Sequence, residues 1–327
     1  MQITAPKLDP REEHFRIPSH HDALSLFARY LPPAKDSAEE QPVVLYVHGG
    51  TFSSALSIAH RFDGRSWRDE LADAGMRVWA FDFHGFGPFS DPYPEMRQAP
   101  EAMPPLGRAE DASRQIEAVV RFVCKREGVA KLSIIAHSWG TIASGLFAGR
   151  CPELVERMAF FGPIAQRPRT ADAVRLPGWR LISLQDQWQR FTETVPDGER
   201  PVLLRRHFDE WGESYLDSDA ESRARTPMAV KVPSGAFQDI FDAWAGELAY
   251  DPALIRAPVA ILRGEWDGTC SDTDARWLFN ALSQSPLRLD IKIGRATHLM
   301  HLEAGRYALY RATEAFLRGC DIAPEAR

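Results

Sequence analysis

The sequence predicts an α/β fold, a mostly parallel, doubly wound sheet of about eight strands with helices on both faces. Short apolar runs, typical of strands buried on both faces, alternate along the chain with longer segments of helical periodicity. The 327 residues are 44% hydrophobic and 26% charged, which is an ordinary balance for a globular protein with a large core.

The first two expected strands are antiparallel edge strands joined by a polar turn around residues 20–22. The later strands are largely continuous apolar runs, as expected of strands inside a parallel sheet. In chain order the segments are HFRIPS (14–19), ALSLFARYLP (23–32), PVVLYVHG (42–49), RVWAFDFHG (77–85), KLSIIAHS (131–138), VERMAFFGPI (155–164), APVAILRGEWD (257–267) and LRLDIKIG (287–294).

Helices are expected between and after these strands. The helix over 66–75 should begin after Ser66, a good N-cap residue, and end at Gly75. The helix over 108–128 carries apolar residues at helical spacing from Ile116 to Val123, which indicates one buried face. Two further helices are expected over residues 139–150 and 302–318.

One long segment, residues 165–250, breaks the alternation because it contains no convincing buried strand. It is rich in aromatic residues, and a structureless loop of this length is improbable in a compact domain. We therefore predict a helical cap over residues 165–250, inserted after the sixth strand of a core domain formed by residues 1–164 and 251–327. Most of its aromatic side chains should form the cap's own core, whereas a few line a ligand pocket beside the sheet.

Composition and charge narrow the classes of partner. The formal net charge of −6 argues against nucleic acid or an anionic membrane as the main partner. The first residues do not resemble a signal peptide, and no segment approaches the roughly 18 apolar residues of a membrane helix. The cysteines at 124, 151, 270 and 320 lack metal-site spacing, which predicts reduced thiols and a cytoplasmic protein. We expect a small-molecule substrate and neither metal nor cofactor; the sequence specifies no oligomeric state.

Ser138 interrupts the apolar run IIAHSWGTIA between a strand and a helix, and two interpretations are possible. It could cap the following helix, a position that serine favours. It could instead be a nucleophile on a tight strand-to-helix turn, which accepts only small residues two positions before and after it. Ala136 and Gly140 occupy those positions, so the G-x-S-x-G pattern is present with alanine in place of the first glycine.

A serine nucleophile needs a base, and the base needs an orienting acid. Asp267 follows one buried strand, and His298 follows the next strand and precedes the last helix. Separately, each has a plainer interpretation, as a solvated loop acid and a surface histidine. Together they give the order Ser, Asp, His at successive carboxyl ends of parallel strands, where side chains can converge. Glu265 and His301 are rival candidates that we expect to be dispensable.

The segment His48-Gly49-Gly50-Thr51 follows the third strand and is a candidate oxyanion hole. Its glycines would allow the backbone N–H of Gly50 to point at a developing oxyanion, and the N–H of Trp139 would supply a second donor. The alternative is an ordinary turn at the end of a strand.

These residues together resemble the α/β-hydrolase superfamily, in its capped branch with a serine nucleophile. The matching motifs are His48-Gly49-Gly50, DFHGFG (82–87), the turn at Ser138, Asp267, and His298 followed by Glu303. The resemblance implies a core sheet with an inserted cap and hydrolysis through an acyl-enzyme without a cofactor. Three residues depart from the family's pattern: Ala136, Thr297 where glycine is common, and His84 where arginine is frequent.

The predicted activity is hydrolysis of a small to mid-sized, apolar or aromatic carboxylic ester or lactone through an acyl-enzyme on Ser138. A C–C bond hydrolase, amidase or acyltransferase could use the same triad, and a receptor or a cofactor-free lyase or oxygenase could share the fold. Epoxide and halide chemistry is disfavoured because those relatives use an aspartate nucleophile. The expected substrate-pocket residues are Thr51, Phe86, Trp188 and Trp211.

Overall fold

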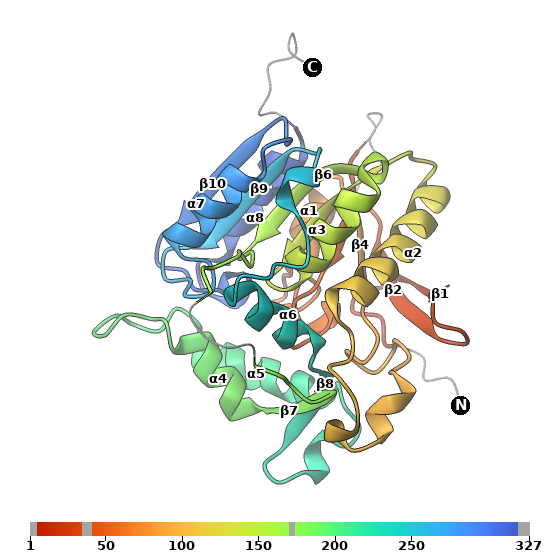
Figure 1. The fold of residues 1–327 in the computed structure, drawn as a ribbon, viewed down its shortest axis with the longest axis vertical. Coiled ribbons are helices and arrows are strands. Elements are labelled where there is room, and N and C mark those ends of the chain that lie inside the picture. The colour runs from red at the N-terminus through yellow and green to blue at the C-terminus, as the bar shows by residue number, and fades with distance from the viewer. Residues whose placement is uncertain (1–4, 35–40, 170–173, 320–327) are drawn as a thin grey trace.

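A computed structural model of the chain describes residues 5–34, 41–169 and 174–319. Its core is an eight-stranded sheet in the order β1-β2-β4-β3-β5-β6-β9-β10 (Figure 1). β1 pairs antiparallel with β2, and β2 antiparallel with β4, whereas the other neighbours are parallel. The strands are β1 (Glu13–Pro18), β2 (Ser25–Leu31), β3 (Val43–Val47), β4 (Arg77–Asp82), β5 (Leu132–His137), β6 (Val155–Phe161), β9 (Val259–Gly264) and β10 (Arg288–Ile293).

Helices cover both faces of this sheet, which confirms the predicted fold class. One face is covered by α1 (Trp67–Asp73) and α8 (Arg306–Leu317), where the rings of Trp67 and Tyr310 stack at 5.2 Å. The other face is covered by α2 (Ala109–Glu127), α3 (Gly140–Arg150) and α7 (Asp272–Ala281). The apolar stripe of α2 is buried as its spacing predicts.

The helix ends follow local chemistry. Ser66 accepts a hydrogen bond from the backbone of Asp69 and begins α1 with a capping box. Gly128 ends α2 in the left-handed conformation, with φ 71°. The last helix begins at Arg306 rather than near residue 302, because Met300–Leu302 forms a separate 3₁₀ turn, η7.

The segment after β6 contains three α-helices, α4 (Leu184–Thr192), α5 (Arg205–Leu216) and α6 (Gly235–Trp244), in its described part. It also contains an antiparallel pair of strands, β7 (Trp179–Ser183) and β8 (Ala229–Pro233), which the prediction of a helical cap without a convincing buried strand did not include. Both strands are five residues long, and Leu181 of β7 is exposed. A short strand with one solvent-facing side lacks the continuous apolar run that marks the core strands.

The cap elements gather at one end of the core, with α6 between the other cap elements and the core (Figure 1). A piece of the predicted core, residues 94–108, joins them through backbone hydrogen bonds. The N–H of Leu106 donates to Gly178 O at 3.0 Å, and the N–H of Gly235 donates to Leu106 O at 2.8 Å. The loop after β4 is therefore part of the cap's support.

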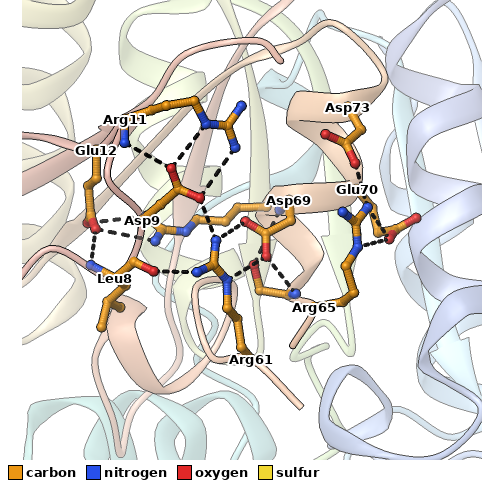
Figure 2. A network of polar contacts seen from close by, with 11 residues as sticks. Leu8, Asp9, Arg11, Glu12, Arg61, Arg65, Asp69, Glu70 and Asp73 are labelled. Atoms are coloured by element: carbon orange, nitrogen blue, oxygen red, sulfur yellow. Dashed lines mark hydrogen bonds and ion pairs between the residues drawn. The ribbon is translucent and has the colours of Figure 1, made fainter. Parts of the chain in front are cut away.

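A polar network holds the N-terminal segment against α1 (Figure 2). Arg61 bridges two acids, with Nη2 at 2.6 Å from Asp9 Oδ2 and Nε at 2.8 Å from Asp69 Oδ2 (Figure 2). Beside it, the fully buried Glu12 accepts from Arg29 Nη1 at 2.6 Å and lies 3.1 Å from Arg68 Nη1. Buried charges are tolerated here because they are paired.

Within residues 5–34, 41–169 and 174–319, no helix combines the length and the apolar character needed to cross a membrane. Cys124, Cys151 and Cys270 are buried free thiols, and Cys320 lies outside the described residues.

Candidate active site

Ser138 lies on the turn between β5 and α3 in a strained backbone conformation, with φ 55°. Positive φ is uncommon for residues other than glycine, and it clusters at functional sites. The N-cap position of α3 is occupied by Trp139, and Ser138 makes no side-chain capping bond there. The helix-cap interpretation of Ser138 is therefore wrong, because its hydroxyl is directed to another partner.

The small neighbours of Ser138 are needed for different reasons. A Cβ added at Gly140 would approach His48 O to 2.5 Å, so only glycine fits where α3 meets the end of β3. Ala136 is fully buried in β5, where the fold accommodates its methyl group in place of the more usual glycine.

His298 connects Ser138 to Asp267. Its Nε2 lies 2.8 Å from Ser138 Oγ, and its Nδ1 lies 3.1 Å from both Asp267 carboxylate oxygens. An ionised carboxylate can only accept, so Nδ1 carries the proton and Nε2 is free to accept from the serine hydroxyl. Asp267 Oδ1 also accepts from the backbone of Thr269 at 2.9 Å and of Cys270 at 3.0 Å, which fixes the carboxylate.

The two rival candidates, Glu265 and His301, lie outside the hydrogen-bonded chain of Ser138, His298 and Asp267. Glu265 is exposed, and its Oε2 accepts from the backbone N–H of Arg295 at 2.9 Å, which closes a surface turn. His301 is buried in η7, and neither ring nitrogen has a hydrogen-bond partner among the described residues. Burial lowers the pKa of His301 to about 3, so its imidazole stays neutral. Neither residue has a hydrogen bond to Ser138 or His298 in the described part of the chain.

Glu303 supports the segment that carries His298. Its carboxyl group accepts from the backbone N–H of Thr297 at 3.2 Å and from the Thr297 hydroxyl. Burial raises the pKa of Glu303 to about 7, with a further contribution from the charge of Asp267, while the bonds from Thr297 oppose the shift. The threonine that replaces a common glycine at 297 is therefore a hydrogen-bond donor to Glu303.

The loop after β3 is held by His48. Its Nδ1–H donates to Gly49 O at 2.7 Å, and its Nε2 accepts from the backbone N–H of Phe83 at 3.1 Å. This arrangement requires a neutral imidazole, and burial lowers the pKa of His48. Gly50 lies beside Ser138, and the backbone N–H groups of Gly50 and Trp139 have no acceptor among the described residues.

The cap helix α6 packs directly on this loop. A Cβ added at Gly50 would come within 2.7 Å of the Ala236 Cβ, so the missing side chain permits the close approach. The indole N–H of Trp139 donates to Asp239 Oδ2 at 2.8 Å, and the same carboxylate accepts from the backbone of Ala109 at 2.7 Å. The cap is thus bonded to the residue that follows Ser138.

A small enclosed cavity touches Ser138. Its free volume is about 10 Å³, close to the space that one water molecule occupies. It is lined by Gly49, Gly50, Thr51, Phe52, His137, Ser138, Arg190 and His298. A much larger cavity, about 1000 Å³, lies around the amino ends of β3, β5 and β6 and contains none of the triad residues. The cavity beside Ser138 is therefore too small for an ester substrate in the conformation that the structure describes.

Of the four expected pocket residues, only Thr51 lines this cavity. Phe86 is buried against the ring of His48 at 5.1 Å. Trp188 packs on Phe208 at 4.9 Å. Trp211, only 1% exposed, donates its indole N–H to Leu56 O at 2.9 Å. The two tryptophans serve the packing of the cap, which needs large apolar side chains to form a core.

Phe52, His137 and Arg190 line the cavity but were not predicted to do so. Phe52 and His137 could have been found, because each directly adjoins a residue of a recognised motif. Arg190 had no such signal, since nothing in the sequence distinguishes it from the other arginines of the cap.

The sequence matches the alpha/beta hydrolase family over residues 44–309, and the chain belongs to this family. No curated protein matches the sequence. The membership agrees with the parallel sheet, the strained serine turn and the strand-end positions of Asp267 and His298.

Several solved structures share the fold. A 2-hydroxy-6-oxo-6-phenylhexa-2,4-dienoate hydrolase from Rhodococcus sp. strain RHA1 aligns with TM-score 0.61 and 18% identity, covering 94% of this chain and 99% of that chain. A serine hydrolase from Cycloclasticus zankles aligns with TM-score 0.58 and 15% identity, covering 95% and 100%. A thermophilic esterase from Thermogutta terrifontis aligns with TM-score 0.55 and 18% identity, covering 94% and 98%. At such identities the similarity concerns the fold alone.

Proposed function

We propose that the protein is a serine hydrolase that cleaves a carboxylic ester or lactone through an acyl-enzyme on Ser138. The observation that carries the proposal is the continuous contact from Ser138 Oγ through His298 to Asp267, at 2.8 Å and 3.1 Å. A serine with a base at hydrogen-bond distance and an acid that orients the base is the arrangement needed for nucleophilic catalysis.

In the first half of the reaction, His298 Nε2 takes the proton of the Ser138 hydroxyl as Oγ attacks the substrate carbonyl. The resulting oxyanion accepts hydrogen bonds from the N–H groups of Gly50 and Trp139, whose freedom from other acceptors supports this role. Collapse of the intermediate breaks the ester C–O bond, and the imidazolium of His298 gives its proton to the departing alcohol.

In the second half, His298 takes a proton from water as the water oxygen attacks the acyl carbonyl. The Ser138 C–O bond then breaks, the proton returns to Ser138 Oγ, and the carboxylic acid leaves. The Asp267 carboxylate accepts from His298 Nδ1 and stabilises the imidazolium. No step needs a metal or cofactor.

The same machinery would serve an amide, an acyltransferase acceptor or a C–C bond next to a carbonyl, because fold and triad do not fix the leaving group. The similar solved structures include both a dienoate hydrolase and an esterase, so the shared fold does not distinguish C–C bond cleavage from ester cleavage. We favour an ester because alkoxide departure needs the least assistance beyond His298.

The proposal is tested by labelling the protein with a neutral fluorophosphonate and by measuring turnover of 4-nitrophenyl esters that differ in acyl size. We expect labelling and turnover in the wild type, and loss of both in Ser138→Ala with retained circular dichroism. Exposed Glu265→Gln is a matched control next to the site, and it should label and turn over as the wild type does.

A further inference from the structure

Arg190 is the only cationic side chain of the cap that lines the Ser138 cavity in the described part of the chain. It lies on α4, where its Nη1 donates to Gln187 Oε1 at 2.8 Å, one helical turn away. No carboxylate of the described residues lies within ion-pair distance of it. Burial lowers the pKa of Arg190, but a guanidinium stays cationic at physiological pH.

Two deeply buried arginines of this molecule, Arg29 and Arg263, each have an acid as a partner. The buried Arg29 has Nη1 at 2.6 Å from Glu12 Oε1, and the buried Arg263 has Nε at 2.8 Å from Asp290 Oδ1. Buried charges are normally paired, because an unpaired charge pays the full cost of leaving water. An arginine kept without an acid beside a reactive serine therefore suggests that a ligand supplies the counter-charge.

A second arginine strengthens this argument. Arg180 of β7 lies 4.4 Å from the centroid of the Phe237 ring, and Arg190 lies 5.7 Å from the same centroid. Among the described residues the guanidinium group of Arg180 has no hydrogen bond or ion pair, although its backbone pairs with β8. Two like charges gathered around one aromatic ring repel each other, and an anion between or beside them would relieve the repulsion.

We propose that the substrate carries a carboxylate that pairs with Arg190 while its acyl carbon lies at Ser138. The inference rests on the proposed function and adds the chemical class of the substrate. The planar fork of a guanidinium matches a planar carboxylate in a two-point contact. Because Arg190 and Ser138 line the same small cavity, the carboxylate is a few atoms from the scissile carbonyl, as in a half-ester of a short dicarboxylic acid.

The test compares two esters that differ in charge and by a single methyl group. One is the 4-nitrophenyl half-ester of glutaric acid, and the other is the same compound with its free carboxylate capped as a methyl ester. Each rate is corrected for uncatalysed hydrolysis, and the ratio of kcat/KM for the anionic over the capped ester is the readout. Glutarate is then tested as a competitive inhibitor of turnover of the capped ester.

We expect the wild type to favour the anionic ester and to be inhibited by glutarate. Arg190→Gln should lower the ratio by about 10- to 100-fold, the range for one charge-assisted contact. Arg190→Lys should give an intermediate ratio, because it keeps the charge and loses the fork. The control Arg205→Gln removes an exposed cap arginine, paired with Asp209 at 2.8 Å, and should leave the ratio unchanged.

Two results would overturn the inference: a wild type that favours the capped ester and ignores glutarate, or an unchanged ratio in folded Arg190→Gln. The wild-type measurements decide the matter if Arg190→Gln does not fold. Labelling of Ser138 by the neutral fluorophosphonate separates the two proposals. An unlabelled wild type rejects the serine hydrolase, whereas a labelled enzyme without preference for the anion rejects only the role of Arg190.

Discussion

Glu303→Gln should change the pH dependence of stability in a direction that the structure fixes. The buried carboxyl group of Glu303 accepts from the backbone and hydroxyl of Thr297, next to His298. Glutamine keeps an acceptor oxygen in the same place, but it cannot ionise. The comparison therefore isolates the cost of placing a charge at this site.

The size of the effect follows from the pKa. Burial raises the pKa of Glu303 from 4.5 to about 7, so the folded state holds its proton over a range in which the unfolded state has lost it. For an acid with a raised pKa, the stabilising contribution is fully present below the unfolded value and is lost as the pH rises through the folded value. The full difference amounts to about 3 kcal/mol of unfolding free energy for a group so deeply buried.

The assay is guanidinium chloride denaturation of the wild type and Glu303→Gln at intervals from pH 4.5 to 8.5. Relative to the wild type, the variant should gain about 3 kcal/mol between the acidic and the alkaline end, with most of the gain below about pH 7. Glu110→Gln, at an exposed position of α2, should show no such trend. A constant difference between Glu303→Gln and the wild type across this range would refute the reasoning.

Two further predictions follow from the packing. Glu12→Gln should lower the unfolding free energy by about 3–5 kcal/mol, because Arg29 and Arg68 would be left buried without their acid. Chemical denaturation measures this loss. A loss under about 1 kcal/mol would show that water pairs these arginines instead. Gly50→Ala should reduce kcat for the esters by about 10²-fold, because its methyl group would meet Ala236 at 2.7 Å and displace the donor N–H. Gly305→Ala, with open space at its Cβ, is the matched control and should keep the wild-type kcat. Equal effects of the two substitutions would contradict the role of the Gly50 N–H.

Much of the fold could be predicted, because each core strand can be recognised from its own short stretch of sequence. Continuous apolar runs such as VVLYV and LSIIAH have few other uses than a strand buried on both faces. The cap was harder to predict, since β7 and β8 are five residues each and a charged side chain interrupts the apolar residues of both. Their strand conformation depends on pairing with each other across a long separation in sequence, which a local pattern does not report.

In the candidate site, too, some residues could be placed from the sequence and others could not. Ser138, Asp267 and His298 could be placed together from their order at strand ends, because the topology of a parallel sheet brings those ends to one side. Trp188 and Trp211 could not be assigned a direction, because a tryptophan of the cap core and one of a pocket have the same local sequence pattern. Arg190 could be recognised as a residue of the site only from the structure, because the packing of α4 brings it to the same cavity as Ser138.

The central claim, that Ser138 carries the acyl group during turnover, is tested most directly by trapping that intermediate. A 4-nitrophenyl ester is mixed with the protein, quenched in acid within the first turnover, and the digested protein is analysed by mass spectrometry. We expect an added acyl mass on the peptide containing Ser138, with a burst of one nitrophenolate per active site, and no adduct in Ser138→Ala. Ester turnover at the wild-type rate in Ser138→Ala, or an acyl group found on another residue, would contradict this claim.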